Sequence, residues 1–165
     1  MRNKMLIGAI VFVGLASVAY AAFAQILTIN GTGTAAGDWD VAITGITRTA
    51  ATGATDAVAP AFTGTSATFD VDLAYPGATA TYEIVVENNG SIPAVLTTLD
   101  GVTAANAAAP TYITYAVTGV TNGTTLGAGG TNTATVVVTW NAASAPTTPN
   151  ETKTATITLN YDQDS

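Results

Sequence analysis

The sequence contains no cysteine and no histidine, and these two absences remove several classes of function. Without cysteine the chain can form neither a disulfide framework nor a thiolate metal site. Without histidine it lacks the commonest general base, the usual zinc ligand and every catalytic arrangement built on imidazole. The sequence therefore predicts a protein that is not an enzyme and that needs no cofactor.

Positive charge is also scarce, since four residues are lysine or arginine and eleven are aspartate or glutamate. Arg2 and Lys4 lie in the N-terminal stretch, so only Arg48 and Lys153 remain beyond it. A protein that binds nucleic acid needs a basic face, and two cations cannot form one. We therefore predict no nucleic-acid partner.

Charged residues of either sign make up only 9% of the chain, whereas threonine, alanine and valine are abundant. Threonine is β-branched and forms hydrogen bonds without carrying a charge, so it suits the outer face of a pleated sheet. A cytoplasmic enzyme usually has about 25% charged residues. The composition is more typical of an extracellular β-domain.

The N-terminal stretch has a basic start and then an apolar run over residues 5–24. This pattern is typical of a helical secretion signal. The small-x-small rule is met by Ala19-Tyr20-Ala21, which predicts a signal peptide of residues 1–21 that signal peptidase cuts between Ala21 and Ala22. The run is also long enough to span a bilayer, so an uncleaved membrane anchor is the alternative. Both interpretations place the rest of the chain outside the cytoplasm.

Period-2 alternation of apolar and polar residues recurs along the rest of the chain, and no helical period is sustained. The alternating segments are residues 39–43, 67–73, 82–86, 113–117, 134–140 and 155–161, with a weaker one at 92–99. Turn residues such as Pro76-Gly77 and Asn89-Gly90 separate them. The pattern predicts an all-β fold over residues 35–165, an antiparallel β-sandwich of jelly-roll or Ig-like type with about seven or eight strands.

The segment that directly follows the predicted cleavage site is apolar on both faces of a strand. Phe23, Leu27 and Ile29 fall on one face, and Ala24 and Ile26 on the other. A strand at the end of a chain is usually blunted by charge or proline, and this one is not. Either it is an inner strand of its own sandwich, or it adds to the sheet of another subunit as a donor strand. The candidate donor residues are Ala22, Phe23, Ala24, Gln25, Ile26, Leu27, Thr28 and Ile29.

Two Asp-x-Asp pairs, Asp38 with Asp40 and Asp70 with Asp72, are the only candidate metal ligands that the pattern offers. A spacing of two places both carboxylates of a pair on one strand face. If the two strands were adjacent, four carboxylates could bind Ca²⁺. A solvated polar face is the alternative interpretation.

Four Asn-x-Ser/Thr sequons make the chain a possible glycoprotein. Their asparagines are Asn30, Asn122, Asn150 and Asn89. Three of the four precede glycine in a turn pattern, where asparagine is favoured for its conformation alone. Asn89 is the weakest candidate, because the turn already accounts for it.

Three stretches of the chain carry a resemblance to a known family. Residues 21–23 read Ala-Ala-Phe at the predicted cleavage site, and residues 35–41 read Ala-Ala-Gly-Asp-Trp-Asp-Val. The most specific stretch joins the Pro-Gly turn of residues 73–77 to the turn Asn-Asn-Gly-Ser-Ile-Pro within residues 86–94. With these motifs the chain resembles the TasA/camelysin family of secreted biofilm-matrix proteins and the related archaeal bundling pili.

This resemblance implies a jelly-roll subunit that polymerises with copies of itself into an extracellular fibre or pilus. It also implies that residues 22–34, once processed, insert into the next subunit. The expected residues of the receiving groove are Trp39, Phe69, Tyr82 and Trp140. The family includes proteins described as metalloproteases, but this chain lacks the histidine and cysteine ligands of such a zinc site.

A second function from another class stays open. The chain could be a monomeric cell-surface adhesin or carbohydrate-binding sandwich, which would present a polar or aromatic platform on a loop. The only long loop that the pattern predicts is the segment from Thr47 to Gly64. Both hypotheses place the protein outside the cell or on its surface.

Overall fold

The computed structural model describes residue 34, residues 36–143 and residues 153–164. The predicted signal peptide, its cleavage site, the donor residues Ala22–Ile29 and the sequon asparagines Asn30 and Asn150 lie outside the described residues. Residues 36–165 cluster as one compact unit. Within the described residues, no helix has the length and apolar character to cross a membrane.

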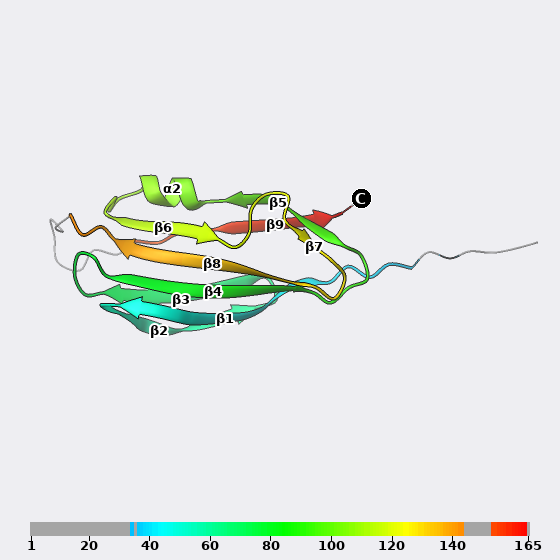
Figure 1. The fold of residues 1–165 in the computed structure, drawn as a ribbon, viewed down its shortest axis with the longest axis horizontal. Coiled ribbons are helices and arrows are strands. Elements are labelled where there is room, and N and C mark those ends of the chain that lie inside the picture. The colour runs from blue at the N-terminus through cyan, green and yellow to red at the C-terminus, as the bar shows by residue number, and fades with distance from the viewer. Residues whose placement is uncertain (1–33, 35, 144–152, 165) are drawn as a thin grey trace, which may run out of the picture. The chain divides into compact units, whose positions relative to one another are not determined.

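The described part of this unit consists of antiparallel strands and a single short helix (Figure 1), which confirms the all-β prediction. A four-stranded sheet has the order β1-β4-β8-β6. Two smaller sheets have the orders β2-β3 and β7-β5-β9. The elements are β1 (Val41–Thr52), β2 (Ala54–Thr63), β3 (Ser66–Leu73), β4 (Thr79–Asn88), β5 (Ala94–Asp100), α2 (Val102–Ala107), β6 (Ile113–Thr118), β7 (Thr125–Leu126), β8 (Thr131–Trp140) and β9 (Thr158–Gln163).

The core lies on one face of the four-stranded sheet, at its two central strands. Alternation along β4 and β8 turns every second side chain toward this face, so their polar residues point away from it. The register places Tyr82 opposite Val136 and Ile84 opposite Ala134. The buried side chains of this face are Ala80, Tyr82, Ile84, Val86, Ala134, Val136 and Val138.

The two smaller sheets cover this face from opposite sides and form a sandwich-like second layer. Phe69 on β3 and Ile157, just before β9, both pack on the clusters built around Tyr82 and Ile84. Each small sheet turns alternate apolar residues inward, as the sequence pattern predicts for a half-buried strand. No ladder of hydrogen bonds joins β3 to β9 in the described residues.

The second layer is tied to the four-stranded sheet along both of its outer sides. On one side, the Ile43 amide donates to the Gly64 carbonyl (2.8 Å) where the β2–β3 hairpin turns. On the other side, the Lys153 ammonium donates to the carbonyls of Pro110 (2.9 Å) and Ile113 (2.6 Å). The Tyr115 hydroxyl donates to the Lys153 carbonyl (2.9 Å). Further bonds join the layers at the central strands, where Asn88 Nδ2 donates to the Leu126 carbonyl (3.2 Å) and Asn132 Nδ2 donates to the Tyr161 hydroxyl (3.3 Å).

The prediction of a loop from Thr47 to Gly64 is wrong. Its first residues continue β1 to Thr52, and β2 occupies the rest after a sharp change of direction at Gly53, whose φ is +57°. The segment consists mostly of alanine, threonine and glycine, which provide too little contrast between apolar and polar positions to reveal a period of two. The platform that the adhesin hypothesis needed is therefore a pair of strands.

A polar network joins the two layers beneath the hairpin. The buried Tyr82 hydroxyl donates to Asp56 Oδ1 (2.6 Å), and Arg48 Nη1 lies 3.1 Å from the same oxygen. Burial and the Asp56 carboxylate together raise the pKa of Tyr82 far above its ordinary value. The Tyr82 ring stacks on Phe69, with ring centroids 4.3 Å apart. The network thus fixes the position of Phe69 from below.

We expect Tyr82→Phe to lower the free energy of unfolding by roughly 1.5–3 kcal/mol at neutral pH, because it removes a hydrogen bond to a charged group. The raised pKa means that Tyr82 stabilises the fold below about pH 10, and that this contribution declines at higher pH as the unfolded state ionises first. The stability difference between wild type and variant should therefore shrink as the pH rises above 10. Urea unfolding between pH 7 and 11 measures it.

The matched control is Tyr75→Phe, since Tyr75 is 49% exposed. This variant should keep the full alkaline loss of stability seen in the wild type. Burial also raises the pKa of Tyr115, so some alkaline loss should persist in Tyr82→Phe. Identical pH curves for wild type and Tyr82→Phe would contradict the role assigned to the network.

Candidate functional site

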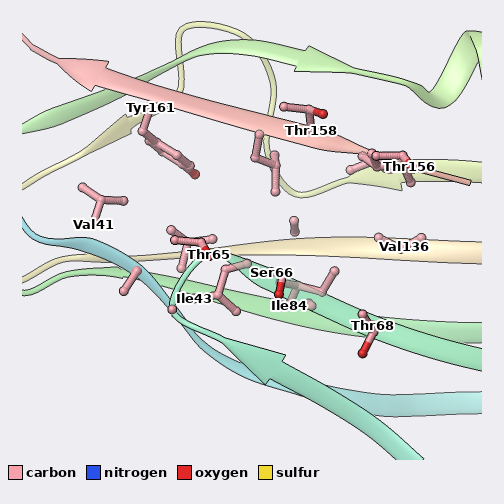
Figure 2. A pocket seen from close by; sticks show the side chains of 18 of the residues that line it. Val41, Ile43, Thr65, Ser66, Thr68, Ile84, Val136, Thr156, Thr158 and Tyr161 are labelled. Atoms are coloured by element: carbon pink, nitrogen blue, oxygen red, sulfur yellow. The ribbon is translucent and has the colours of Figure 1, made fainter. Parts of the chain in front are cut away.

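A slot with a volume of about 600 Å³ opens in the second layer, between β3 and the segment 155–161 (Figure 2). Its floor belongs to the four-stranded sheet and includes Ile84, Val86 and Val136. Figure 2 shows Tyr161 projecting from β9 toward the space opposite Val41 and Ile43 of β1. In the slot, the inner face of the large sheet lies open between β3 and the segment 155–161.

Along each wall of the slot, apolar side chains that face inward alternate with polar side chains that face outward, as they do along a half-buried strand. The inward-facing apolar residues are only half-buried, in contrast to the buried floor beneath them. They are Ala67 and Phe69 on one wall and Ala155, Ile157, Leu159 and Tyr161 on the other. The intervening residues are exposed polar side chains, such as Thr68, Thr156 and Thr158. The slot is thus apolar inside and polar at its rim.

The backbone edges that face the slot lack ladder partners in the described part of the chain. β3 pairs only with β2, and β9 pairs only with β5. Residues 153–157, just ahead of β9, belong to no strand at all. Backbone amides and carbonyls are obligatory hydrogen-bonding groups, so two facing free edges form a template for one more strand.

The two walls run in opposite directions. Along the floor from Tyr82 toward Val86, the contacting residues of β3 proceed from Leu73 back to Ala67. The contacting residues of the other wall proceed from Ala155 forward to Tyr161 over the same distance. Any single strand in the slot must therefore be parallel to one wall and antiparallel to the other.

Trp39 stands at one end of the slot, near Val41, and 43% of its surface is exposed. Tyr161 and Val41 pack together against the cluster of Val86 at this end. Of the four aromatic residues expected in the groove, Trp39 and Phe69 line it. Tyr82 is buried beneath Phe69, and Trp140 stacks on Tyr112 with ring centroids 5.7 Å apart. Trp39 and Phe69 therefore line this slot, and Tyr82 and Trp140 do not; that the slot receives a donor strand stays a prediction.

The turn of residues 88–92 holds the chain that leads into β1. The Asn89 amide donates to the Asp40 carbonyl (2.8 Å), and the Ser91 amide donates to the Asp38 carbonyl (2.9 Å). The Asp38 amide in turn donates to Ser91 Oγ (2.9 Å). We call this arrangement the exit clamp: residues 88–92 bound to residues 38–40. It fixes the path of residues 38–40 as they lead into β1.

Asn88 and Gly90 make the exit clamp possible. The Asn88 side chain is fully buried and donates to the carbonyls of Ile92 (2.8 Å) and Leu126 (3.2 Å), while its own oxygen accepts from the Gly90 amide (3.0 Å). Every polar atom of this buried side chain is satisfied, which makes the turn rigid. A Cβ atom at Gly90 would overlap the Asp38 carbonyl oxygen and the Asp40 amide nitrogen.

We expect Gly90→Ala to displace residues 38–40 and to cost about 1–3 kcal/mol of stability through this overlap. The amides of Asn89 and Ser91 should lose protection against hydrogen exchange, because their acceptors belong to the displaced segment. Gly127→Ala is the matched control, since a Cβ there meets no atom within 4 Å. Equal protection of both amides in Gly90→Ala and wild type would show that the clamp does not depend on this contact.

The two Asp-x-Asp pairs do not meet on neighbouring strands. Asp38 and Asp40 precede β1, which belongs to the four-stranded sheet, and Asp70 and Asp72 lie on β3 in a separate sheet. The described residues contain no group of three acidic side chains placed to hold a metal ion. The adjacency on which the Ca²⁺ prediction depended is therefore not met.

The two sequon asparagines within the described residues occupy exposed turns. Asn89 is exposed in the exit clamp, where its backbone amide is bound. Asn122 is exposed as well, and its side-chain oxygen accepts from the Leu99 amide (2.7 Å). The side chain of Asn122 thus already supports the fold, and glycosylation at either position stays a prediction.

Sequence reasoning identified the strands of the slot but could not reveal the slot itself. The slot exists because β3 and β9 do not pair, and only the order of strands in the sheets shows this.

Comparison of this chain with protein families, with curated proteins and with solved structures finds no match.

Proposed function

We propose that this chain is a secreted structural subunit of an extracellular fibre or pilus, of the kind found in biofilm matrices. Subunits polymerise when the N-terminal segment of one copy, residues 22–34, completes the sandwich of another by donor-strand complementation. The observation that carries this proposal is the open slot between β3 and β9, with its two free backbone edges and apolar interior.

The shape and lining of the slot favour a peptide strand over a small ligand. Its volume of about 600 Å³ would also suit a small molecule, so the volume alone does not decide. The walls decide, because two opposed strand edges present rows of amides and carbonyls at strand spacing. An extended peptide satisfies both rows at once and sends alternate side chains onto the floor.

A strand in the slot would join the two small sheets into one. The second layer would then have the order β2-β3-donor-β9-β5-β7 opposite the four-stranded sheet, which would complete a two-sheet sandwich. The outer edge of β2 is a poorer template for an added strand, because Pro60 and two register shifts interrupt β2. Proline and bulges are common means of protecting an edge strand from pairing.

The energetics require both the apolar side chains and the backbone bonds of the donor. Burial of Phe23, Leu27 and Ile29 would contribute roughly 5–9 kcal/mol, at about 1.5–3 kcal/mol for each side chain. Association costs an estimated 4–15 kcal/mol in lost freedom, so side-chain burial alone barely offsets it. Hydrogen bonds to two edges, at about 0.5–1.5 kcal/mol each, supply the surplus that a stable fibre needs.

The N-terminal pattern supports a site of action outside the cell. A signal peptide of residues 1–21 would direct export, and signal peptidase would release the donor only after the chain has crossed the membrane. Before cleavage the donor is continuous with the apolar signal, so processing controls when assembly begins. The resemblance of residues 73–94 to TasA/camelysin and archaeal pilus proteins agrees with this function.

Deletion of residues 22–34 should leave a secreted, folded protein that forms no filaments, because the slot stays empty. Electron microscopy and size-exclusion chromatography of the mature protein measure the result. A synthetic peptide of residues 22–34, added in excess to the truncated protein, should bind and raise its melting temperature. Filaments formed by the truncated protein would contradict the proposal.

A charge inside the slot should block assembly, whereas the same charge at its rim should not. We expect Leu159→Lys to abolish filaments, because the inward side chain would place an ammonium group in the apolar interior. Thr158→Lys is the matched control, since Thr158 is exposed on the opposite face of β9. Circular dichroism confirms that both variants fold. Equal filament yield from both variants would locate assembly elsewhere.

A further inference from the structure

We infer that the side chains of Asn106 and Lys153 close the outer edge of β6, so that a second copy of the chain cannot pair its own β6 with it. We call these two side chains the edge plug. The inference goes beyond the proposed function and does not depend on it, because it concerns a strand edge other than the two that face the slot. Hydrogen bonds to the backbone of β6 carry it.

The outer edge of β6 would be an open template without further contacts. β6 is the last strand of the four-stranded sheet and pairs only with β8 in the described residues. In an antiparallel pair, every second residue turns both of its backbone groups away from the neighbouring strand. Tyr115 is such a residue, because its amide and carbonyl both bind a side chain outside the sheet. Ile113 and Val117, two positions away on either side, therefore also face outward.

The Asn106 side chain binds Tyr115 as a neighbouring strand would. Its Oδ1 accepts from the Tyr115 amide (2.8 Å), and its Nδ2 donates to the Tyr115 carbonyl (2.9 Å). A carboxamide offers a donor and an acceptor side by side, and a residue in a hydrogen-bonded antiparallel pair exchanges these same two bonds with its partner. Asn106 therefore occupies the place that the backbone of an added strand would need.

The short helix α2 holds Asn106 at this edge. Ala105, the residue before it, is buried in the same core cluster as Tyr115. At the start of the helix Gly101 has a φ of +93°, and a Cβ atom there would overlap the Thr156 carbonyl oxygen. The helix is thus packed between the core and the segment ahead of β9, and this packing limits how far the Asn106 side chain can move from the edge.

The Lys153 ammonium closes the adjacent outward position. It donates to the Ile113 carbonyl (2.6 Å) and to the carbonyl of Pro110 (2.9 Å), just ahead of β6. The Tyr115 hydroxyl donates to the Lys153 carbonyl (2.9 Å), so both the backbone and the side chain of the lysine are held. Burial lowers the pKa of Lys153, which agrees with an ammonium group partly withdrawn from water. A charge at a strand edge is a common means of preventing edge pairing.

An asparagine side chain closes an edge of the second layer in a similar way. Next to the short β7, the outer edge of β5 is covered where Leu96 exchanges two backbone hydrogen bonds with the turn of residues 121–124. Farther along β5, the Leu99 amide donates to Asn122 Oδ1 (2.7 Å). Asn122 thus satisfies one outward group of β5, and Asn106 satisfies two of β6. Closing outer edges with side-chain amides is therefore a recurrent feature of this sandwich.

Without the edge plug, β6 would be able to pair with β6 of a second copy. Two copies related by a two-fold axis present the same edge to each other in antiparallel orientation. With the two Tyr115 residues opposite each other, Ile113 of each copy lies opposite Val117 of the other. All three positions turn their backbone groups outward, so the pairing would satisfy each of them.

The test uses the chain of residues 22–165 with Leu159→Lys, in which the charge inside the slot should already prevent filaments. We expect Asn106→Ala in this background to associate reversibly as its concentration rises, whereas the parent stays monomeric. Alanine favours a helix more than asparagine does, so the substitution opens the edge without weakening α2. Sedimentation velocity measures the association, and circular dichroism confirms the fold. Adding Lys153→Met, which removes the ammonium and keeps an apolar stem, should strengthen the association.

Hydrogen exchange at the Tyr115 amide shows whether β6 is the strand that pairs. In the dilute monomer of Asn106→Ala this amide should exchange roughly 5- to 10-fold faster than in the parent, because it has lost a hydrogen bond. In the associated form the same amide should be protected again, because it then bonds to β6 of the second copy.

Asn106→Asp and Asn141→Ala are the matched controls, and both should stay monomeric. The carboxylate of Asn106→Asp still accepts from the Tyr115 amide but repels the Tyr115 carbonyl, so this variant loses stability while a charge keeps the edge closed. Asn141 accepts from the Ala143 amide (2.9 Å) in an exposed turn, so its replacement removes a similar bond away from any strand edge.

Three results would overturn the inference. They are a monomeric Asn106→Ala despite faster exchange at Tyr115, association without renewed protection of that amide, and equal association of Asn106→Ala and Asn106→Asp. The proposed function fails by a different result, which is filament formation by Leu159→Lys with the edge plug intact. Exchange at the Tyr115 amide reports on the edge plug in either case, so the two failures are distinguishable.

Discussion

The structure depends on covering one apolar sheet face. Alternation along β4 and β8 places an unbroken apolar surface on one side of the four-stranded sheet, and such a surface must be buried against another layer. Two small sheets cover its margins, and hydrogen bonds from Ile43 and Lys153 tie them there. Between the two small sheets part of this face stays uncovered, and this uncovered part is the floor of the slot.

The free edges of the two small sheets are turned toward the slot. A free strand edge on the outside of a molecule is a hazard, because it pairs with any extended chain. Here the two free edges face each other across a narrow recess, with exposed polar residues such as Thr68 and Thr158 at the rim. The donor strand that we propose would use both edges at once, because each edge offers unpaired backbone groups to an extended chain.

The sequence predicted much of the fold, and its failures have identifiable causes. Strong contrast between apolar and polar residues correctly located β3, β4, β8 and β9. The segment from Thr47 to Gly64 was predicted as a loop, because strands made of alanine and threonine look alike on both faces. Asn89-Gly90 was correctly predicted as a turn, but a turn pattern does not show that the turn binds residues 38–40. Trp140 is apolar and alternates correctly, yet it packs on Tyr112 outside the slot, since alternation specifies a face and no position along it.

The sequence by itself determined the class of strand, the polar and uncharged surface, and the absence of histidine and cysteine chemistry. These properties are local, because each follows from the residue types or from a period of two along the chain. The tertiary structure alone decided which strands are neighbours, and therefore that β3 and β9 face each other without pairing. Nearly every residue has the same backbone donor and acceptor, so the sequence of a strand does not show which other strand it pairs with. The slot arises from a pairing that is missing between segments about ninety residues apart, and closure over such distances is settled only when the whole sandwich packs.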